Sequence, residues 1–222
     1  LNVLYSDKTG TITKGVLEVT TFFTADGKEI ELDKLSEKAG KVKGLLDLSI
    51  GKNTSAMYDT SHKVVGGNLT DHALLKFLGE DTYIALYEDK NAMVTKSQPF
   101  NSSNKFSQSY IAGLGKTFYK GAPERLVTKA TKYMDANGKI VAMDKDVINA
   151  KIDELAKRAM RVLAFGYSEK EMVDDKINDD IVIIGLVGIR DDIRPEAKAA
   201  IAEVQGAGIQ VVMITGDRLE TA

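Results

Sequence analysis

The first residues of the chain place a carboxylate where a phosphoryl group could be transferred. Residues 1–6 have the pattern of a short strand, and Asp7 follows them at the start of a polar loop, residues 7–15. The end of a parallel strand faces the crevice in which such sheets bind ligands. A carboxylate there can form an aspartyl phosphate, and Gly10 can expose backbone N–H groups to phosphate oxygens. The alternative is an ordinary strand-to-loop turn, for which these residue types are common.

The elements that position such residues differ between the ends and the middle of the chain. Both ends carry short apolar strands, and the order strand, helix, strand indicates a parallel sheet buried on both faces. The middle is rich in hairpins. We therefore predict an α/β fold in which an antiparallel sheet flanked by helices is inserted into an incomplete parallel α/β domain. Expected strands are 16–23, 92–100, 107–120 with a turn at 113–115, 161–167, 181–189 and 209–215, and expected helices are 32–49, 71–78 capped by Thr70, 123–134, 147–160 and 195–205.

The composition narrows the class of protein. The chain has 222 residues, 43% of them hydrophobic, which is enough for one good core or two small ones. With 30 Lys and Arg against 32 Asp and Glu, it lacks the basic surface of a nucleic-acid binder. The absence of cysteine excludes disulfides and fits a reducing compartment. The longest apolar run, 181–189, is shorter than the roughly 20 residues of a membrane-spanning helix, so we expect a soluble chain.

A series of strings along the chain resembles the signatures of P-type cation-transporting ATPases, and DKTGT, which begins at Asp7, is the most specific of them. Their order matches the family and they span nearly the whole chain, which is therefore identified as a member. The resemblance implies a haloacid-dehalogenase-like phosphorylation domain at residues 1–15 and 190–222, with a nucleotide-binding domain at 16–189 between them. The other strings, in order, are GGNLTDHALL, PFNSSNKF, FYKGAPE, RVLAF, GIRDDIRP and MITGD.

For the DKTGT string, the resemblance implies that Asp7 is the phosphorylated nucleophile, with Lys8 beside it in the catalytic loop. Thr9 would contact phosphate and Mg²⁺ through its backbone, so Asp7 and Thr9 are the expected metal contacts. Soluble phosphatases of the haloacid dehalogenase class carry a second Asp at the position of Thr9, where it acts as general acid and base. Threonine cannot do this, and an aspartyl phosphate here is expected to last.

Two strings in the middle imply the adenosine end of an ATP site. In PFNSSNKF, Phe100 would stack on adenine and Lys105 would meet the phosphate tail; the alternative for Phe100 is a core position on an edge strand. In FYKGAPE, Lys120 would line the bottom of the pocket and Gly121 its wall. The alternative there is a solvated lysine at a strand-to-helix turn.

Two further strings imply contacts with the nucleotide. Asp71 stands where the family has a Glu that hydrogen-bonds the adenine amino group. The side chain of Asp71 is one methylene shorter than that Glu. Its alternative role is that of an acid in the first turn of a helix. Arg161, in RVLAF, would contact the ATP phosphates, and its alternative is a surface salt bridge.

The end of the chain implies a hinge and a phosphate loop. Asp191 and Arg194 match the family's Asp-Pro-x-Arg hinge, while Asp192 replaces the proline and leaves the hinge less rigid. In the family the Asp and Arg help to hold nucleotide and align the domains; helix capping before Pro195 is the alternative for the aspartates. The loop that binds the transferred phosphate would comprise Thr215, Gly216 and Asp217, the last of which could instead cap a helix.

Taken together, the resemblance predicts part of a calcium-pump-like ATPase that uses ATP and Mg²⁺. The expected partners are the transmembrane and actuator domains of the same pump, so the chain would be a cytoplasmic piece of a cell-membrane protein. Alone, it is expected to be a monomer that binds nucleotide without turnover. The alternatives are a soluble haloacid-dehalogenase-type phosphatase with a cap domain and a non-catalytic nucleotide sensor.

Overall fold

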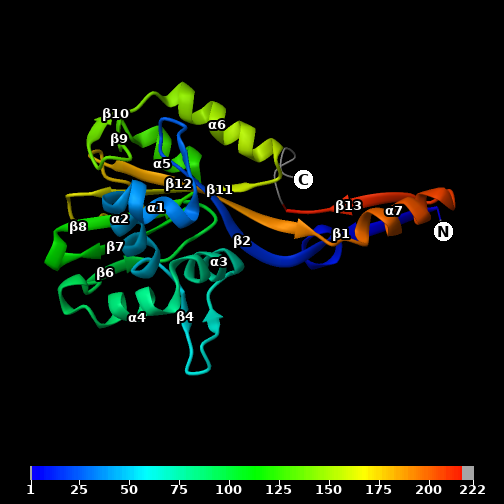
Figure 1. Ribbon diagram of the computed structural model, residues 1–222, viewed down its shortest axis with the longest axis horizontal. Coiled ribbons are helices and arrows are strands. Elements are labelled where there is room, and N and C mark those ends of the chain that lie inside the picture. Colours follow the sequence, from blue (N-terminus) through cyan, green and yellow to red (C-terminus); the bar gives the residue numbers. More distant parts are fainter. Residues whose placement is uncertain (1, 217–222) are drawn as a thin grey trace.

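Nine strands of the described chain, residues 2–216, form one sheet in the computed structural model (Figure 1). The main path of this sheet runs β10-β9-β12-β11-β8-β7-β6, while β2 pairs with β12 and β3 pairs with β2. Its pairings are antiparallel except for β9 with β12. The strands are β2 (Thr13–Phe23), β3 (Glu29–Ile30), β6 (Lys96–Gln98), β7 (Phe106–Ile111), β8 (Lys116–Gly121), β9 (Lys132–Met134), β10 (Ile140–Ala142), β11 (Arg161–Ser168) and β12 (Val182–Ile193).

Helices cover both faces of the sheet, and together with it they form what we call the body (Figure 1). One face carries α1 (Leu35–Lys38), α2 (Gly40–Gly51), α3 (Leu69–Leu78) and α4 (Glu80–Glu88), and the other carries α5 (Pro123–Lys129) and α6 (Lys145–Lys157). Three 3₁₀ turns complete it: η2 (Leu32–Lys34), η3 (Lys90–Ala92) and η4 (Ala112–Leu114). Across the described residues, no helix combines the length and the apolar character needed to cross a bilayer.

Two hydrophobic clusters fill the body, one on each face of the sheet, because neighbouring residues of a strand point to opposite faces. On β2, Phe22 belongs to the cluster under α1 to α4, while Phe23 belongs to the cluster under α5 and α6. The same alternation separates Phe118 from Tyr119 on β8. It places the next side chain of β8, Lys120, on the face that carries α2 and α3.

A second region, which we call the arm, projects from the body (Figure 1). It consists of β1 (Val3–Asp7), α7 (Ala197–Gly206) and β13 (Gln210–Ile214). β1 and β13 pair in parallel, from Val3 with Gln210 to Asp7 with Ile214. The long strands β2 and β12 join arm to body, since their pairing begins at Thr13 with Ile193 and ends at Phe23 with Leu186.

Most expected elements are present, with corrections to their limits. The expected helix 32–49 is wrong in its first part, because η2 and α1 precede a break at Ala39, whose φ is −150°. Thr70 does not cap α3, because the Asn68 side chain accepts from the Asp71 N–H instead. The helix expected over 123–134 ends at Lys129 and is followed by β9. The strand expected over 92–100 is reduced to β6.

Several elements of the body were not predicted from the sequence, among them the short strands β3 and β10. The hairpin of β4 (Ala56–Tyr58) and β5 (Val64–Gly66) projects below α3 (Figure 1). The helix α4 directly follows α3, from which Gly79 separates it with a φ of +86°. The hairpin expected around residues 113–115 is confirmed, and Gly115 takes the left-handed conformation that closes it.

Candidate functional site

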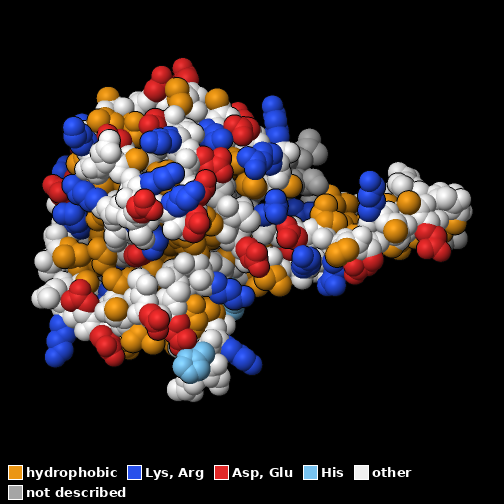
Figure 2. All heavy atoms as spheres, in the orientation of Figure 1, with side chains coloured by type: hydrophobic (Ala, Val, Ile, Leu, Met, Phe, Trp, Pro, Cys, Tyr) orange, Lys and Arg blue, Asp and Glu red, His pale blue; other side chains and the backbone are white. Residues whose placement is uncertain are grey.

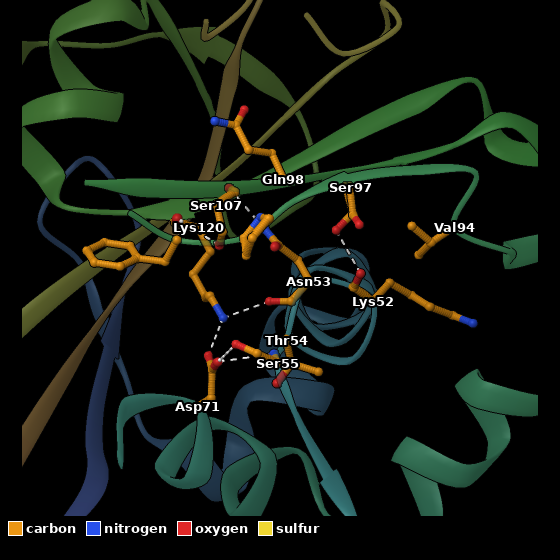
Figure 3. Close-up of a pocket in the computed structure, with 13 residues that line it drawn as sticks. Lys52, Asn53, Thr54, Ser55, Asp71, Val94, Ser97, Gln98, Ser107 and Lys120 are labelled. Atoms are coloured by element: carbon orange, nitrogen blue, oxygen red, sulfur yellow. Dashed lines mark hydrogen bonds and ion pairs between the residues drawn. The ribbon is translucent and has the colours of Figure 1, made fainter. Parts of the chain in front are cut away.

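A cavity of about 370 Å³ opens on the α2 and α3 face of the sheet (Figure 3). Its walls come from the segment after α2, from the first turn of α3, and from β6, β7 and β8. Most of the residues that line it are polar or charged, and Val94, Pro99 and Phe100 are the apolar ones. The remaining lining residues are Lys52, Asn53, Thr54, Ser55, Asp71, Ser97, Gln98, Ser107, Ser109 and Lys120.

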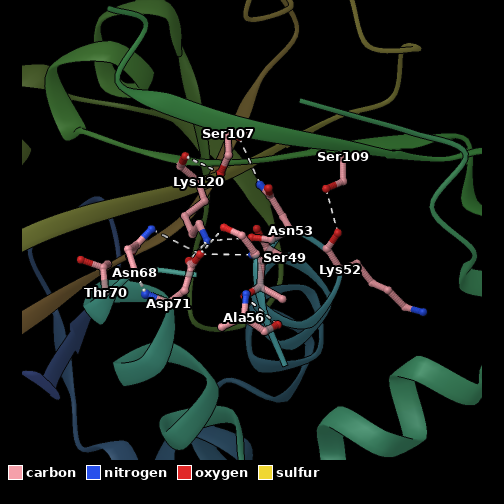
Figure 4. Close-up of polar contacts among 12 residues, drawn as sticks. Ser49, Lys52, Asn53, Ala56, Asn68, Thr70, Asp71, Ser107, Ser109 and Lys120 are labelled. Atoms are coloured by element: carbon pink, nitrogen blue, oxygen red, sulfur yellow. Dashed lines mark hydrogen bonds and ion pairs between the residues drawn. The ribbon is translucent and has the colours of Figure 1, made fainter. Parts of the chain in front are cut away.

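A buried ion pair lies at the floor of this cavity (Figure 4). Lys120, 6% exposed, reaches from β8 to Asp71, 3% exposed, on α3. The Lys120 Nζ also donates a hydrogen bond of 2.7 Å to the backbone carbonyl of Asn53. Lys120 is therefore not the solvated lysine of the alternative interpretation. It is held by the protein at the position where the sequence predicted the bottom of a pocket.

Several protein groups bind the Asp71 carboxylate. Besides Lys120, it accepts from the Ser55 N–H at 3.2 Å, the Ser55 hydroxyl at 2.8 Å and the Asn68 Nδ2 at 3.4 Å. Burial raises the pKa of Asp71, but the Lys120 charge and the hydrogen bonds from Lys120 and Ser55 outweigh burial and hold the pKa below its usual range. Burial lowers the pKa of Lys120, and the Asp71 charge opposes part of that change. Asp71 also lies in the first turn of α3, as its alternative interpretation states.

Phe100 and Lys105 lie close in the chain but have different surroundings. Phe100 lines the cavity and is 52% exposed, so the alternative that it is a core residue is wrong. An exposed ring beside a cavity is available to stack on a planar ligand. Lys105 is not among the residues that line the cavity, and its Nζ lies 3.3 Å from Glu124 Oε1.

Gly121 contributes through packing. A Cβ atom at this position would lie 2.6 Å from the Lys105 carbonyl oxygen and 2.6 Å from the Phe106 Cβ. The lack of a side chain therefore lets β8 approach the start of β7 directly beside Lys120. Gly121 is not among the residues that line the cavity, so its place in the wall of the pocket stays a prediction.

Arg161 begins β11 and lies outside the cavity lining. Its side chain is exposed, and a guanidinium nitrogen lies 3.4 Å from the Thr70 hydroxyl in the first turn of α3. Asp71 follows Thr70 on the same turn, so Arg161 contacts the helix that supplies the floor of the cavity. The structure thus brings Asp71, Phe100 and Lys120 together and leaves Lys105 and Arg161 outside the lining.

The strand ends in the arm gather the residues predicted to handle phosphate. Because β1 and β13 run in parallel with Asp7 opposite Ile214, the loops that follow both strands leave the same edge. These loops begin with Lys8 and Thr9 on one side and with Thr215 and Gly216 on the other. Asp7 and Thr9 are exposed. Asp217, the last predicted member of this group, lies outside the described residues.

The same strand ends suit a metal ion that arrives bound to phosphate. Residues 2–216 contain no group of three or more His, Asp or Glu side chains that could hold a metal. Mg²⁺ is usually held by one or two carboxylates together with water and substrate phosphate. The exposed Asp7 carboxylate and the backbone at Thr9 are suited to that shared kind of coordination.

Asp191 and Arg194 bind the loop that follows Asp7. The Asp191 carboxylate accepts from the Thr13 hydroxyl at 2.5 Å and from the Gly15 N–H at 3.0 Å. Arg194 donates to the carbonyl of Thr13 at 3.1 Å and to that of Gly10 at 3.0 Å. We call these five residues the junction, since they lie where the arm meets β2 and β12.

The junction contacts correct one interpretation of the aspartates. Helix capping before Pro195 is wrong, because α7 begins at Ala197 and its N-cap residue, Glu196, makes no side-chain capping bond. Asp192, where the family motif has proline, pairs instead with Arg190 at 2.8 Å and Lys14 at 3.7 Å.

Sequence reasoning missed the polar residues that complete the cavity. Asn53 and Ser55 follow α2 and contact Lys120 and Asp71, and Ser107 faces them from β7. No motif marks them, since Asn, Thr and Ser after a helix are typical of any loop. The pairing that makes them important joins segments far apart in the sequence.

Comparisons with known proteins show which family this chain resembles. Residues 41–196 match the family model described as "P-type ATPase, cytoplasmic domain N". The chain is 33% identical over 240 residues to "Calcium-transporting ATPase 10, plasma membrane-type" of Oryza sativa subsp. japonica, which covers 98% of this chain and 23% of that protein. Identity is 30% to "Calcium-transporting ATPase 1" of Saccharomyces cerevisiae and 31% to "Calcium-transporting ATPase 1" of Bacillus cereus, with 100% of this chain covered in both.

The chain spans about a quarter of the length of these relatives, with 23%, 26% and 25% of each covered. The matched family region contains the cavity and both of its buried charges. The chain belongs to the P-type ATPase family, and it includes that family's cytoplasmic domain N.

Proposed function

We propose that this chain is the ATP-binding and phosphoryl-acceptor part of a calcium-transporting P-type ATPase. The observation that carries the proposal is the cavity, in which Phe100, Lys120 and Asp71 meet although they come from separate strings of the sequence. We assign residues 16–189 to the nucleotide-binding domain. Residues 1–15 and 190–222 would be the two pieces of a haloacid-dehalogenase-like phosphorylation domain, which the parallel pairing of β1 with β13 supports.

In this proposal the adenine ring enters the cavity and stacks on Phe100. Lys120 forms the floor of the cavity beneath the ring. Gly121, which has no side chain, allows β8 to lie close to the start of β7 beside Lys120. The phosphates point out of the cavity, where Lys105 and Arg161 supply positive charge at its outer side. Charge-assisted contacts from lysine and arginine suit a triphosphate, because both side chains are cations that donate N–H groups to phosphate oxygens.

Phosphoryl transfer would take place at the strand ends of the arm. Asp7 attacks the γ-phosphorus, the bond to the leaving ADP oxygen breaks, and Asp7 becomes an aspartyl phosphate. Lys8 and the loop of Thr215, Gly216 and Asp217 would balance the charge of the transferred group. Mg²⁺ bound with the nucleotide would be held at Asp7 and the backbone of Thr9, where it neutralises phosphate charge.

The junction gives Asp191 and Arg194 a role in this step. Their hydrogen bonds to Thr13, Gly15 and Gly10 fix the backbone of the acceptor loop, so that Asp7 is presented in one orientation. Bending of β2 and β12 near Gly15 and Asp191 would carry the γ-phosphate from the cavity to Asp7. None of the residues that line the cavity belongs to the arm, so such a motion is required.

The ion and the partners follow from the relatives. Their printed names are calcium-transporting ATPases, and we propose calcium as the ion moved by the whole protein. The partners would be the transmembrane and actuator domains of the same pump, in the cell membrane. Thr9 stands against the alternative of a soluble phosphatase, because it cannot serve as a general acid or base.

An ATP titration followed by backbone NMR tests the nucleotide site. We expect saturable shifts at residues around the cavity, and we expect Phe100→Ala to weaken binding about tenfold by removing the stacking surface. Tyr87→Ala is the matched control, because Tyr87 is also an exposed aromatic residue but does not line the cavity. Absence of shifts at millimolar ATP would refute the proposed site.

A second measurement separates binding from turnover. We expect the isolated chain to behave as a monomer that binds ATP but does not phosphorylate Asp7. Incubation with ATP labelled at the γ-phosphate and Mg²⁺ should leave no label on the acid-precipitated protein. Label that is lost in Asp7→Asn would contradict the proposed inactivity and would still support the assignment of the nucleophile.

A further inference from the structure

The polar groups that line the cavity differ in whether they can accept a new hydrogen bond. Asp71 is occupied by Lys120, Ser55 and Asn68. Gln98 Oε1 accepts from the Gln108 amide and from the Asp175 N–H, and its Nε2 donates to Asp175. The hydroxyls of Ser107 and Ser109 donate to backbone carbonyls. These hydroxyls keep lone pairs that can accept, but among the amide and carboxylate oxygens of the lining in residues 2–216, only the side-chain oxygen of Asn53 has no partner.

Asn53 supplies such an acceptor in a fixed orientation. Its side-chain Nδ2 donates to the carbonyl of Ser107 at 3.1 Å (Figure 4) and to that of Phe118 at 3.4 Å. Both neighbours of this nitrogen are carbonyl oxygens, so a reversed amide would set oxygen against oxygen. The side chain is 5% exposed, which leaves it little freedom to rotate. The amide oxygen, Oδ1, must then be the atom that Asn53 offers to the cavity.

Asn53 Oδ1 has no hydrogen-bond partner among residues 2–216. A buried oxygen without a partner is costly, and Gln108 Oε1 is the one side-chain atom that the described chain buries fully in that condition. Asn53 Oδ1 therefore keeps an opening to solvent, and Asn53 lines the cavity. The Asn53 side chain is thus held in place through its nitrogen, while its oxygen keeps an unpaired lone pair for a ligand in the cavity.

We propose that Asn53 Oδ1 accepts a hydrogen bond from the exocyclic amino group of the adenine ring and so selects adenine nucleotides over purines without that group. The inference rests on the proposed function, and it assigns the amino group to Asn53 rather than to Asp71. A site with a fixed acceptor rejects a ligand that lacks the matching donor, because the acceptor is then left buried and unpaired.

The choice of Asn53 over Asp71 follows from the cost of each contact. Both oxygens of Asp71 are already paired, Oδ1 with Lys120 and Oδ2 with Ser55, and the residue is only 3% exposed, so little of the carboxylate is open to a ligand. Asn53 loses nothing, since its nitrogen keeps both carbonyls while its oxygen binds the ligand. The side chain is therefore a specificity residue whose structural bonds and ligand bond use different atoms.

The test compares two nucleotides that differ only in this amino group. Dissociation constants for ATP and for purine riboside 5′-triphosphate, which carries hydrogen in place of the amino group, are measured by calorimetry on the whole chain. We expect the purine riboside nucleotide to bind about tenfold more weakly, the effect of one hydrogen bond. In Asn53→Ala we expect ATP to weaken to the level of the purine riboside nucleotide, whose own affinity stays unchanged.

Two further variants separate ligand recognition from folding. Asn178→Ala is the matched control, because the Asn178 amide also donates to backbone carbonyls but does not line the cavity. It should leave the ratio between the two nucleotides unchanged. If Asn53→Ala does not fold, Asn53→Ser, which keeps a short donor but withdraws the amide acceptor, replaces it. In the wild-type chain, the ¹³Cγ signal of Asn53 should shift with ATP and not with the purine riboside nucleotide.

The outcomes distinguish this inference from the proposed function. Equal affinity of the wild-type chain for both nucleotides would overturn the role of Asn53 and leave the ATP site in place. The role of Asn53 is likewise overturned if Asn53→Ala or Asn53→Ser keeps the full ratio. Failure of the wild-type chain to bind either nucleotide would refute the proposed function itself.

Discussion

The body and the arm differ in how far their side chains are buried. The body has a hydrophobic cluster on each face of its sheet, and the charged pair at its cavity is buried with hydrogen-bonding partners. The described part of the arm has no buried residue in β1, α7 or β13, and Tyr5, Ile193 and Ile214 at and beside its strands are each more than half exposed. Figure 2 shows hydrophobic side chains on the surface of the arm.

This difference indicates which part of the mechanism is preformed. A two-stranded sheet is marginally stable unless something packs against it. The cavity is therefore built on the stable region, while the nucleophile is built on a region held mainly by its junction with β2 and β12. Binding and transfer can then be tested separately, because a variant in one region need not change the other.

The largest effect is expected at the floor of the cavity. Replacing Lys120 by Met keeps an unbranched side chain but leaves the Asp71 carboxylate buried without its cation. Removal of one partner of a buried pair costs about 3–5 kcal/mol, so the free energy of unfolding of the body should fall by that amount in urea denaturation. The double variant Lys120→Met with Asp71→Asn, which leaves no buried charge, should recover part of the loss. A loss below about 1 kcal/mol, as at an exposed pair, would mean that the pair is hydrated.

A smaller loss is expected when Gly121 becomes Ala. The added Cβ would lie 2.6 Å from both the Lys105 carbonyl and the Phe106 Cβ. Overpacking of this kind costs about 1–3 kcal/mol, measured as a lower free energy of unfolding. Gly44→Ala is the matched control within α2, where a Cβ meets nothing within 4 Å. The control should instead stabilise the body by up to about 1 kcal/mol, because alanine is the better helix former.

The sequence predicted the core of the fold better than its edges. Strands β11 and β12 were predicted because their apolar runs are continuous, and tertiary packing only extended β12 to Ile193. The β4–β5 hairpin escaped prediction because its strands are three residues long, and Met57 and Val65 are exposed. The break at Ala39 is likewise invisible in the apolar spacing of residues 32–49.

The residues of the site could be predicted only where they belong to a sequence motif. Lys120 and Phe100 were found because each belongs to a recognisable motif. Their surroundings could not be predicted, since the Lys120–Asp71 pair joins residues 49 positions apart and the Lys120–Asn53 bond joins residues 67 apart. Asn53 belongs to no motif. Its proposed role depends on the carbonyls of Ser107 and Phe118, which bind its side-chain nitrogen and leave its side-chain oxygen unpaired.

Acid should remove the contribution of the buried pair to the stability of the body. The pKa of Asp71 is lower in the folded chain than the ordinary value of about 3.9. Such a carboxyl contributes stability that is fully present above its unfolded pKa and is lost as the pH falls through its folded pKa. The difference in free energy of unfolding between the wild type and Asp71→Asn should therefore be constant near neutral pH and shrink below about pH 4. A difference that grows in acid would contradict the direction of the shift.

The smallest effect is expected at the junction, and it should be confined to one region. In Asp191→Asn, the side chain can no longer accept from both the Thr13 hydroxyl and the Gly15 N–H, because one carboxylate oxygen becomes an NH₂ group. Loss of one such bond corresponds to about 1 kcal/mol, so hydrogen exchange at the Gly15 amide should accelerate several-fold while β11 and β8 keep their protection. Asp192→Asn is the neighbouring control, since Asp192 forms only exposed ion pairs, which contribute little. Faster exchange throughout the body in Asp191→Asn would mean that arm and body unfold as one unit, and the separation between a preformed cavity and a hinged nucleophile would then be wrong.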